Sequence, residues 1–367
     1  MKVALLHDFF EKPGLSGGGE NLAITVARAF KADVYTAYVH PAFEMSNNVN
    51  TTEVFPKARE MRKGSKTLAI MNAFEKLDLI GKYDLYIFSG TNCITAAQKH
   101  HPNLLYCHTP PRWLYDLREW FDANTNILGR VAMNVLRKKI YPIDQFYMRQ
   151  FDKIITNSET VRQRLKQFYN DEMYENASVV YSFLELKKYR NKKSQGYYLS
   201  TARLDPLKRI DLIVKAFLEM SQKLYVISTG PMLEQIRNMA DGHDNIAVLG
   251  WVDDKKMIDM LAGCVATIQM PINEDLGLGP MESMAAGKPC IAANEGGPAE
   301  TVINGKTGML IAPDVKSIKK AVGWMTLKRA ESMKKACLAR ANFFSRENFI
   351  KRMIKAASEA IENHEKK

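Results

Sequence analysis

The sequence predicts an α/β fold with two domains, each built on a parallel sheet. Short apolar runs typical of buried strands alternate with helical patterns along the whole chain, as in sheets that are covered by helices on both faces. The alternation occurs in two series, and a polar, lysine-rich stretch over Leu186 to Gly196 separates them. A chain of 367 residues is also too long for one ordinary core.

The first series begins with a strand, a glycine loop and a helix. Lys2 to Asp8 is typical of a buried strand, and a helical pattern follows over Glu20 to Phe30. The loop between them ends in S-G-G-G, whose glycines are Gly17, Gly18 and Gly19. This order is typical of phosphate or sugar binding, although G-x-G-x-x-G and a Walker lysine are absent. A flexible strand–helix turn explains the same residues equally well.

The rest of the first half contains further apolar runs. Strands are expected over Ala32 to Val39, Asp84 to Phe88, Asn103 to Cys107, Lys153 to Thr156 and Val179 to Tyr181. His108 directly follows one of these strands, in Y-C-H-T-P-P-R-W. Because ligand sites of parallel sheets lie at the carboxyl ends of the strands, we expect His108 to line a cleft. A histidine with a purely structural role is the alternative.

The second half repeats this pattern. It opens with a strand over Tyr197 to Thr201, a loop, and an amphipathic helix from about Arg209. Arg203 and Lys208 lie in the loop, where two cations can bind a diphosphate without a metal ion; two solvated basic residues are the plainer interpretation. Further strands are expected over Leu224 to Ser228, Ile246 to Trp251, Val265 to Met270 and Lys288 to Ala293, and a long helix over Phe344 to Ile361.

The stretch E-D-L-G-L-G-P-M-E-S-M-A-A-G, from Glu274 to Gly287, combines a carboxylate, a glycine-spaced turn and a short helix. Its first glutamate falls just beyond the carboxyl end of an expected strand. Pro280 suits the first turn of the helix, so we expect Glu282 in that turn as well. Backbone amides near Leu278 and Gly279 would converge where the helix dipole stabilises an anion. A glutamate that only offsets the helix dipole is the alternative interpretation of Glu282.

Composition indicates a globular protein with a basic surface. The formal net charge of +12 implies anionic partners such as nucleic acid, membrane lipid or a phosphorylated substrate, but no nucleic-acid-binding motif accompanies it. No run approaches the ~20 apolar residues that span a bilayer and no signal peptide is recognisable, so we expect a cytoplasmic protein. The five cysteines are scattered, which indicates reduced core residues and no metal site.

Two basic stretches of the first half suggest contact with an anionic membrane. They contain Lys57, Arg59, Arg62, Lys63 and Lys66, and Arg130, Arg137, Lys138, Lys139 and Arg149. In the second stretch the basic residues lie among apolar ones at helical spacing, which is typical of a helix on a membrane surface. A helix packed on its own domain produces the same pattern.

The segment from Glu274 to Leu310 resembles the signature of retaining glycosyltransferases of the GT-B fold, family four. It has E-x7-E, then M-A-x-G-x-P and G-G-x-x-E, and it is most similar to lipopolysaccharide-type mannosyltransferases, which begin this motif with E-D-F-G. Leu276 replaces the usual phenylalanine. The segments that begin at Arg203 and at His108 also match the family, so the resemblance covers nearly the whole chain.

The resemblance implies two Rossmann-like domains that face each other across a cleft. The acceptor-binding domain would be 1–185, the nucleotide-sugar-binding domain 186–343, and 344–367 a helix that crosses back to the first. The implied activity is metal-independent and cofactor-free transfer of a hexose, and the implied sugar is mannose from GDP-mannose. A glycan or lipid-linked acceptor of cell-surface polysaccharide synthesis is implied, which favours a peripheral position on the inner face of the membrane.

The resemblance also implies roles for individual residues. The implied catalytic residues are His108 and Glu274. The implied donor-binding residues are Arg203, Lys208, Gly250, Trp251, Val252, Leu278, Gly279 and Glu282, the last on the ribose hydroxyls. The glycines Gly17, Gly18 and Gly19 would face the acceptor and the donor phosphates. No metal ligand is implied.

Two other classes of function remain open from the sequence. A nucleotide-sugar epimerase on the same architecture would release an epimerised sugar without an acceptor, and the combination of E-x7-E with R-x4-K argues against it. A nucleic-acid-binding protein is favoured only by the charge, and it would bind random DNA in a salt-dependent way without affinity for nucleotide sugars.

Overall fold

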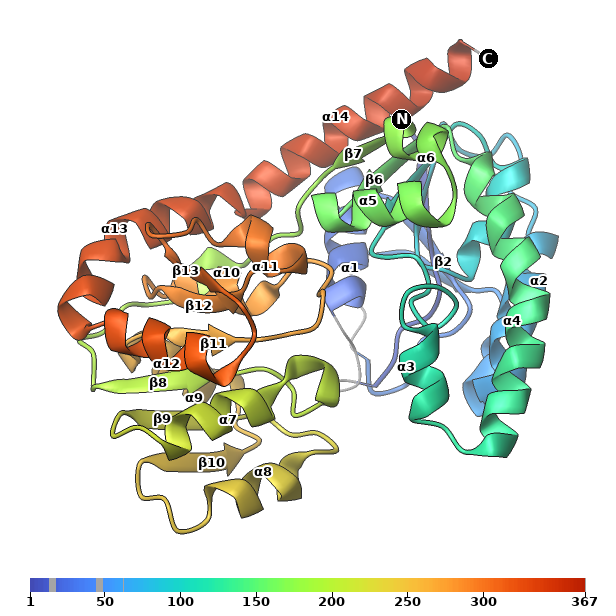
Figure 1. Ribbon diagram of the computed structural model, residues 1–367. Coiled ribbons are helices and arrows are strands. Elements are labelled where there is room, and N and C mark those ends of the chain that lie inside the picture. Colours follow the sequence, from blue (N-terminus) through green and yellow to red (C-terminus); the bar gives the residue numbers. More distant parts are fainter. Residues whose placement is uncertain (13–17, 44–48, 62, 367) are drawn as a thin grey trace. The chain divides into compact units, whose positions relative to one another are not determined.

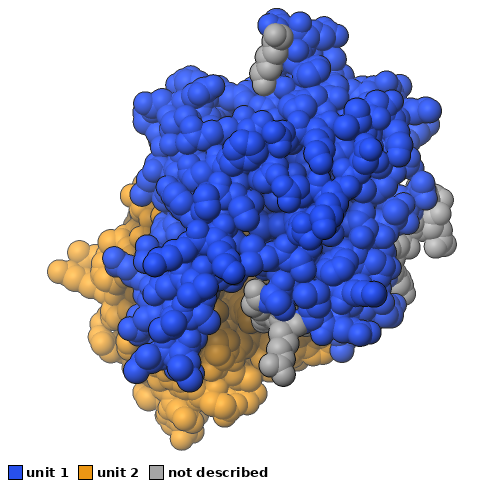
Figure 2. All heavy atoms as spheres, turned by 90° about the vertical axis from the view of Figure 1, so that its right-hand side faces the viewer, with its two compact units in different colours: residues 1–180, 350–367 blue, residues 181–349 orange. Residues whose placement is uncertain are grey.

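The described residues form two α/β units, drawn as ribbons in Figure 1. The structure is a computed structural model, and it describes residues 1–12, 18–43, 49–61 and 63–366. Unit 1 comprises Met1–Val180 and Ile350–Lys367, and unit 2 comprises Tyr181–Phe349, as coloured in Figure 2. The C-terminal helix α14 (Arg346–Glu365) therefore begins in unit 2 and ends in unit 1.

Unit 1 is built on a parallel sheet of seven strands in the order β3-β2-β1-β4-β5-β6-β7. Its strands are β1 (Val3–His7), β2 (Asp33–Thr36), β3 (Thr51–Glu53), β4 (Leu85–Ser89), β5 (Asn103–Cys107), β6 (Lys153–Thr156) and β7 (Ala177–Val179). Every residue of β1, β4 and β5 is buried, because helices cover both faces of a parallel sheet.

The helices of unit 1 follow the strands in alternation. They are α1 (Gly18–Phe30), α2 (Lys63–Lys76), α3 (Arg118–Ala123), α4 (Ile127–Tyr147), α5 (Glu159–Phe168) and α6 (Asp171–Asn176), with 3-10 turns η1 (Pro56–Glu60), η2 (Cys93–Lys99) and η3 (Met148–Gln150). Polar side chains cap two of them: Asn126 accepts a hydrogen bond from the backbone N–H of Gly129 in α4, and Ser158 caps α5.

Unit 2 has a parallel sheet of six strands in the order β10-β9-β8-β11-β12-β13. Its strands are β8 (Tyr197–Ser200), β9 (Lys223–Ile227), β10 (Ile246–Gly250), β11 (Thr267–Gln269), β12 (Cys290–Ala293) and β13 (Gly308–Ile311). Its helices are α7 (Ile210–Leu218), α8 (Leu233–Ala240), α9 (Asp254–Gly263), α10 (Leu278–Ala285), α11 (Gly296–Thr301), α12 (Val315–Trp324) and α13 (Leu327–Phe343), with η4 (Leu186–Lys188) and η5 (Pro206–Lys208).

Both sheets have the strand order of a Rossmann fold. In each, the first strand of the unit lies between the second and the fourth, so the order of the strands reverses beside β1 and beside β8. Sheets of this order bind ligands outside the carboxyl ends of the strands at that switch point. The predicted α/β fold with two Rossmann-like domains is confirmed. The short strands β3 and β13 at the sheet edges are not predicted by the sequence pattern.

Two further expectations concern the interior and the membrane. All five cysteines are buried, as expected for core residues. Across the described parts of the chain, no helix combines the length and the apolar character that crossing a bilayer requires.

Candidate functional site

The loop after β8 presents Lys208 in a fixed position. Leu204 holds the loop against the next turn, since its N–H donates to the carbonyl of Thr229 at 3.0 Å. Gly230 lies so close that a Cβ there would be 2.2 Å from the carbonyl oxygen of Leu204. Asp205 then caps η5 by accepting a hydrogen bond from the N–H of Leu207 at 3.0 Å, and Lys208 ends this single turn. The sequence A-R-L-D-P-L-K therefore folds as an anchored loop and a one-turn helix.

The loop after β11 presents Glu274, and the turn with Gly296 and Gly297 at the start of α11 packs against this loop. The N–H of Gly297 donates to the carbonyl of Glu274 at 2.7 Å. A Cβ at Gly296 would be 2.6 Å from the backbone nitrogen of Glu274, and one at Gly297 would be 2.3 Å from the Cα of Leu276. The adjacent glycines at the start of α11 are therefore required by the close approach of the Glu274 loop.

Two ion pairs join the loops at this edge of the unit 2 sheet. The Lys208 ammonium donates to a carboxylate oxygen of Glu274. Beside it, Nη1 of Arg209 donates to Oε1 of Glu295 at 2.6 Å, and the N–H of Asn273 donates to the same oxygen at 3.1 Å. Such partly exposed pairs contribute only about 0–1 kcal/mol. An anionic ligand can therefore recruit the Lys208 ammonium at little cost.

Glu282 lies in the second turn of α10, which corrects its expected place in the first turn. The helix begins at Leu278, two residues before Pro280, because proline is tolerated throughout a first helical turn. Tyr189 donates its hydroxyl to Oε1 of Glu282 at 3.1 Å. Burial raises the pKa of Glu282 to about 7; the hydrogen bond from Tyr189 opposes this effect, and the Asp254 carboxylate adds to it. Glu282 is thus a partly buried carboxyl that changes charge near neutral pH.

The start of α10 lies against the sheet. Gly277 caps the helix with a φ of 83°, in the left-handed region that favours glycine. A Cβ at Gly279 would be 2.8 Å from Nε2 of Gln269, whose amide in turn donates to Thr201 at 3.0 Å. Leu278 is partly exposed. The first N–H groups of a helix have no partner within it, so this turn can donate to an anion.

Among the remaining predicted residues of unit 2, Arg203 and Trp251 are exposed, whereas Gly250 is buried. Gly250 ends β10 with a φ of 72°, and its carbonyl accepts from the N–H of Ser228 at 2.7 Å. Trp251 is 75% exposed, which leaves its ring accessible to a flat ligand, whereas Val252 packs on a small apolar cluster. Arg203 is exposed. The structure groups Lys208 with Glu274, and it does not bring Arg203 into their ion pair.

His108 lies where β1, β4 and β5 of unit 1 end. Its Nε2 is 3.0 Å from the hydroxyl of Ser89, the last residue of β4. Nδ1 of His7 contacts the Ser89 carbonyl. A Cβ at Gly19, in the first turn of α1, would be 3.7 Å from the His108 ring. Burial lowers the pKa of His108 to about 4, and the neighbouring His7 adds to this effect. The imidazole is therefore neutral at physiological pH.

Sequence reasoning missed Asp8, which organises the same edge of the unit 1 sheet. It follows β1, and its carboxylate accepts hydrogen bonds from the N–H groups of Thr91, Asn92 and Cys93 at 2.9, 2.9 and 2.8 Å. A Cβ at Gly90 would be 2.3 Å from Oδ1 of Asp8. The rule that sites follow strand ends applies to Asp8 as it does to His108, so the signal was present.

The predicted glycine loop is only partly described. Gly17 lies outside the described residues. Gly18 begins α1 and is exposed, and Gly19 approaches His108 as stated above. Tyr189, which contacts Glu282, was also missed by sequence reasoning, because it lies in the polar stretch that the sequence pattern assigns to a linker.

The second basic stretch folds as α4 and η3; several of its apolar residues are exposed, whereas Ile140 and Tyr147 are buried. The exposed fractions are 76% for Ile127, 82% for Leu128, 58% for Val131 and 51% for Val135. Arg130, Lys138 and Lys139 of α4 and Arg149 of the following turn η3 are exposed as well. We call these eight exposed residues the α4 surface. Arg137 does not belong to it: the side chain is buried, and Nη1 donates to Asp122 at 2.7 Å.

The basic residues of the first stretch are less available to an anionic partner than their number suggests. Arg59 donates to Glu53 at 2.8 Å, and Lys66 lies 3.6 Å from the carboxylate of Glu11. Lys57 is exposed, and Arg62 lies outside the described residues. Part of this charge is therefore already neutralised within unit 1.

Comparison with known proteins identifies the class of enzyme. Residues 183–339 match the family model described as Glycosyl transferases group 1. The chain is 24% identical to alpha-1,3/1,6-mannosyltransferase ALG2 of Dictyostelium discoideum, over 88% of each chain. Its fold is similar to that of the Anabaena protein Alr3699/HepE in complex with UDP-glucose, with a TM-score of 0.70, 15% identity, and coverage of 96% and 99%. It is also similar to the lipopolysaccharide outer core galactosyltransferase WaaB, with a TM-score of 0.71, 14% identity, and coverage of 97% and 99%. The fold is therefore GT-B.

Proposed function

We propose that this glycosyltransferase, whose residues 183–339 match the group 1 family model, transfers a hexose from a nucleotide sugar with retention of the anomeric configuration. The donor we propose is GDP-mannose, in keeping with the mannosyltransferase among its relatives. The acceptor is a glycan or a lipid-linked glycan of cell-surface polysaccharide synthesis. The observation that carries the proposal is the pairing of Lys208 with Glu274 beside the start of α10.

The donor diphosphate is bound by cations and backbone amides. Lys208 exchanges its contact with Glu274 for the phosphates, and Arg203, exposed in the same loop, joins it. Amides near Leu278 and Gly279 add donors at the positive end of the helix dipole. These groups offset the charge of the departing diphosphate, so the donor binds without a metal ion between the phosphates.

The nucleoside is bound by Glu282 and by the end of β10. A carboxylate accepts two hydrogen bonds from the cis-diol of a ribose, and Glu282 already accepts one from Tyr189. The exposed ring of Trp251, with Gly250 and Val252 on either side of it in the chain, offers a surface for the base. Glu282 must be ionised for this role, so its raised pKa sets the lower pH limit of donor binding.

The chemical step requires a stabilised oxocarbenium-like sugar and removal of the acceptor proton. Once Lys208 moves to the phosphates, the Glu274 carboxylate orients sugar hydroxyls and supports positive charge. His108, held neutral and within 3.0 Å of Ser89, contacts the donor sugar and helps to stabilise the transition state. The departing phosphate takes the acceptor proton on the same face of the ring, so no covalent glycosyl-enzyme forms.

Unit 1 carries acceptor recognition and membrane contact. Gly18 and Gly19 lie at the strand edge where His108 is found, and with Gly17 they form the proposed acceptor loop. The α4 surface combines exposed apolar side chains with exposed cations, which favours an anionic membrane as the place where a lipid-linked acceptor is met.

The decisive experiment joins a donor screen with product analysis. A panel of nucleotide sugars is tested for thermal stabilisation, since a ligand that binds only the folded state raises the melting temperature. GDP-mannose should give the largest shift. The NMR spectrum of the first product should show the donor's axial anomeric linkage preserved; an inverted linkage, a sugar trapped on Glu274, or an epimerised free sugar would refute the proposal.

Variants of the cation site test the donor assignment. Charge-assisted hydrogen bonds are each worth about 1.5–3 kcal/mol, so Arg203→Ala or Lys208→Ala should lower kcat/KM by roughly one to two decades. Lys215→Ala is the matched control, because this lysine pairs with Asp211 on the surface of α7. Undiminished turnover in the Arg203→Ala, Lys208→Ala double variant would contradict the assignment.

A further inference from the structure

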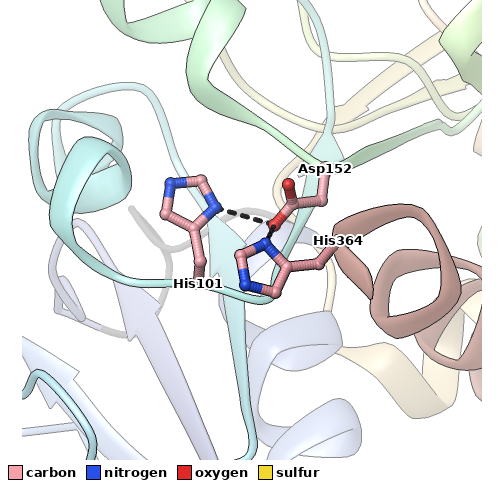
Figure 3. A group of neighbouring side chains, drawn as sticks. All are labelled: His101, Asp152 and His364. Carbon is pink, nitrogen blue, oxygen red and sulfur yellow. Dashed lines mark hydrogen bonds and ion pairs between the residues drawn. The ribbon is translucent and has the colours of Figure 1, made fainter. Parts of the chain in front are cut away.

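Three side chains of unit 1 with metal-binding atoms converge far from His108. Nδ1 of His101 lies 2.7 Å from Oδ2 of Asp152, and Nδ1 of His364 lies 3.5 Å from the same oxygen. One ligand atom from each residue lies within 4.8 Å of the other two. The imidazole rings of the two histidines stack, with centroids 5.3 Å apart and planes 14° from parallel. Figure 3 shows the two rings on one side of the carboxylate.

The spacing of these atoms suits a tetrahedral metal ion. Zinc binds imidazole nitrogen at about 2.0–2.1 Å and carboxylate oxygen at about 2.0–2.2 Å, which separates neighbouring ligand atoms by roughly 3.3 Å. The observed 2.7 and 3.5 Å from Oδ2 of Asp152 bracket that separation, and the third pair of ligand atoms lies within 4.8 Å. Two imidazoles and one carboxylate are ligands that zinc-like divalent transition metals accept, whereas magnesium prefers oxygen alone.

Neighbouring groups hold the carboxylate in place as a supporting shell does in metal sites. The Asp152 side chain is fully buried, and the N–H of Asn103 donates to its Oδ2 at 2.9 Å. The Asn103 side chain accepts from the N–H of Asp152 at 2.8 Å, and Asn363 donates to the Asp152 carbonyl at 3.1 Å. His101 and His364 are 26% and 42% exposed, which leaves an open side for entry of the ion and for a water ligand.

We propose that His101, Asp152 and His364 form a binding site for Zn²⁺ or a similar divalent transition metal. The bound ion joins the last turn of α14 to the segments that lead into β5 and β6, so it stabilises the attachment of residues 350–367 to unit 1. In the bound form each imidazole coordinates through Nδ1, and its proton is on Nε2.

The site is separate from the proposed catalytic residues. His101 and Asp152 precede β5 and β6, whereas His108 follows β5. A strand of five residues is roughly 16 Å long at about 3.3 Å per residue, and it separates the two ends of the sheet. The role of the metal is therefore structural, and it does not conflict with donor binding by cations alone.

Isothermal titration of the chelator-treated full chain with Zn²⁺ tests the proposal. One ion should bind per chain, and Mg²⁺ should not compete. His364→Ala should weaken binding at least about tenfold, because removing even supporting groups costs metal sites 10–100-fold. This variant changes a partly exposed residue at the end of a helix, so folding is preserved. His101→Gln should weaken Zn²⁺ binding in the same way, and it tests the second imidazole ligand.

The matched control is His243→Ala, which removes an exposed histidine of unit 2. It should leave Zn²⁺ affinity and stoichiometry unchanged. Zn²⁺ should also raise the melting temperature of the wild type and of the control, and at the same concentration it should raise that of His364→Ala less. Absence of binding, or equal affinity in His364→Ala and wild type, would overturn the assignment.

Discussion

Replacing Glu282 with glutamine should make the protein more stable while it weakens donor binding. The wild-type carboxyl is held in surroundings that disfavour its charge, and its pKa rises from 4.5 to about 7 as a result. Glutamine has nearly the same shape and no charge, and its carbonyl oxygen can still accept the hydrogen bond from Tyr189. The variant therefore removes the cost of burying the charge without leaving the Tyr189 hydroxyl unpaired.

The magnitude and the pH range follow from the two pKa values. Because the pKa is higher in the folded state, the stability that proton binding contributes is fully present below about pH 4.5 and is lost as the pH rises through about 7. A tenfold change in proton affinity is worth about 1.4 kcal/mol, so the full effect is about 3 kcal/mol, and partial exposure of the side chain reduces it to about 1–3 kcal/mol. Glu282→Gln should gain this amount near pH 8 and almost nothing near pH 4.

Urea unfolding at both pH values measures the stability, and calorimetric titration with the nucleotide diphosphate measures the binding. The wild-type dissociation constant should rise up to about tenfold for each pH unit below about 7, because only the carboxylate accepts both ribose hydroxyls. Binding by the variant should be weak and independent of pH. Glu331→Gln, at an exposed position of α13, should change stability by less than about 0.5 kcal/mol. Equal stability of wild type and Glu282→Gln near pH 8, or unchanged nucleotide affinity, would refute the reasoning.

Three further predictions follow from the same structure. Tyr189→Phe removes a hydrogen bond that lowers the pKa of Glu282, so donor binding measured by calorimetry should begin to weaken at a higher pH than in wild type. His108→Ala should reduce turnover far more than nucleotide binding. Because the pKa of His108 is about 4, the pH–rate profile of the wild type should show no step between about pH 5.5 and 8 that disappears in this variant. In flotation with anionic liposomes at low salt, Leu128→Ser, Val131→Ser should bind less than wild type, whereas Ile354→Ser, 50% exposed on α14, should bind equally; failure of the wild type to float would remove the membrane proposal.

The local sequence pattern alone predicted the fold class, because the alternation of buried strands and amphipathic helices depends on residues that are close together in the sequence. The strands over Asn103–Cys107 and Lys153–Thr156 have the predicted bounds. The glycine-spaced turn after Glu274 was also readable, since a close backbone approach admits only glycine. Family resemblance then supplied the class of enzyme, which the comparisons support.

The sequence could not predict which distant side chains meet. Lys208 and Glu274 are 66 residues apart, and they pair because β8 and β11 are neighbours in the sheet. Arg137 was counted with the basic surface, yet it lies inside and pairs with Asp122. Helical periodicity identifies the apolar face of a helix and the residues beside that face. Which of these neighbouring residues are buried depends on the loop that packs against the helix.

The sequence by itself determined the two parallel-sheet domains, the loops at their strand ends and the residue types on which the proposed donor site rests. Only the tertiary structure decided that Glu282 is a partly buried carboxyl bonded to Tyr189, and that His101 and His364 share one carboxylate of Asp152. The physical reason is that strand order and the return of α14 bring together residues far apart in the chain, and burial there, which no local pattern encodes, sets their charge and their chemistry.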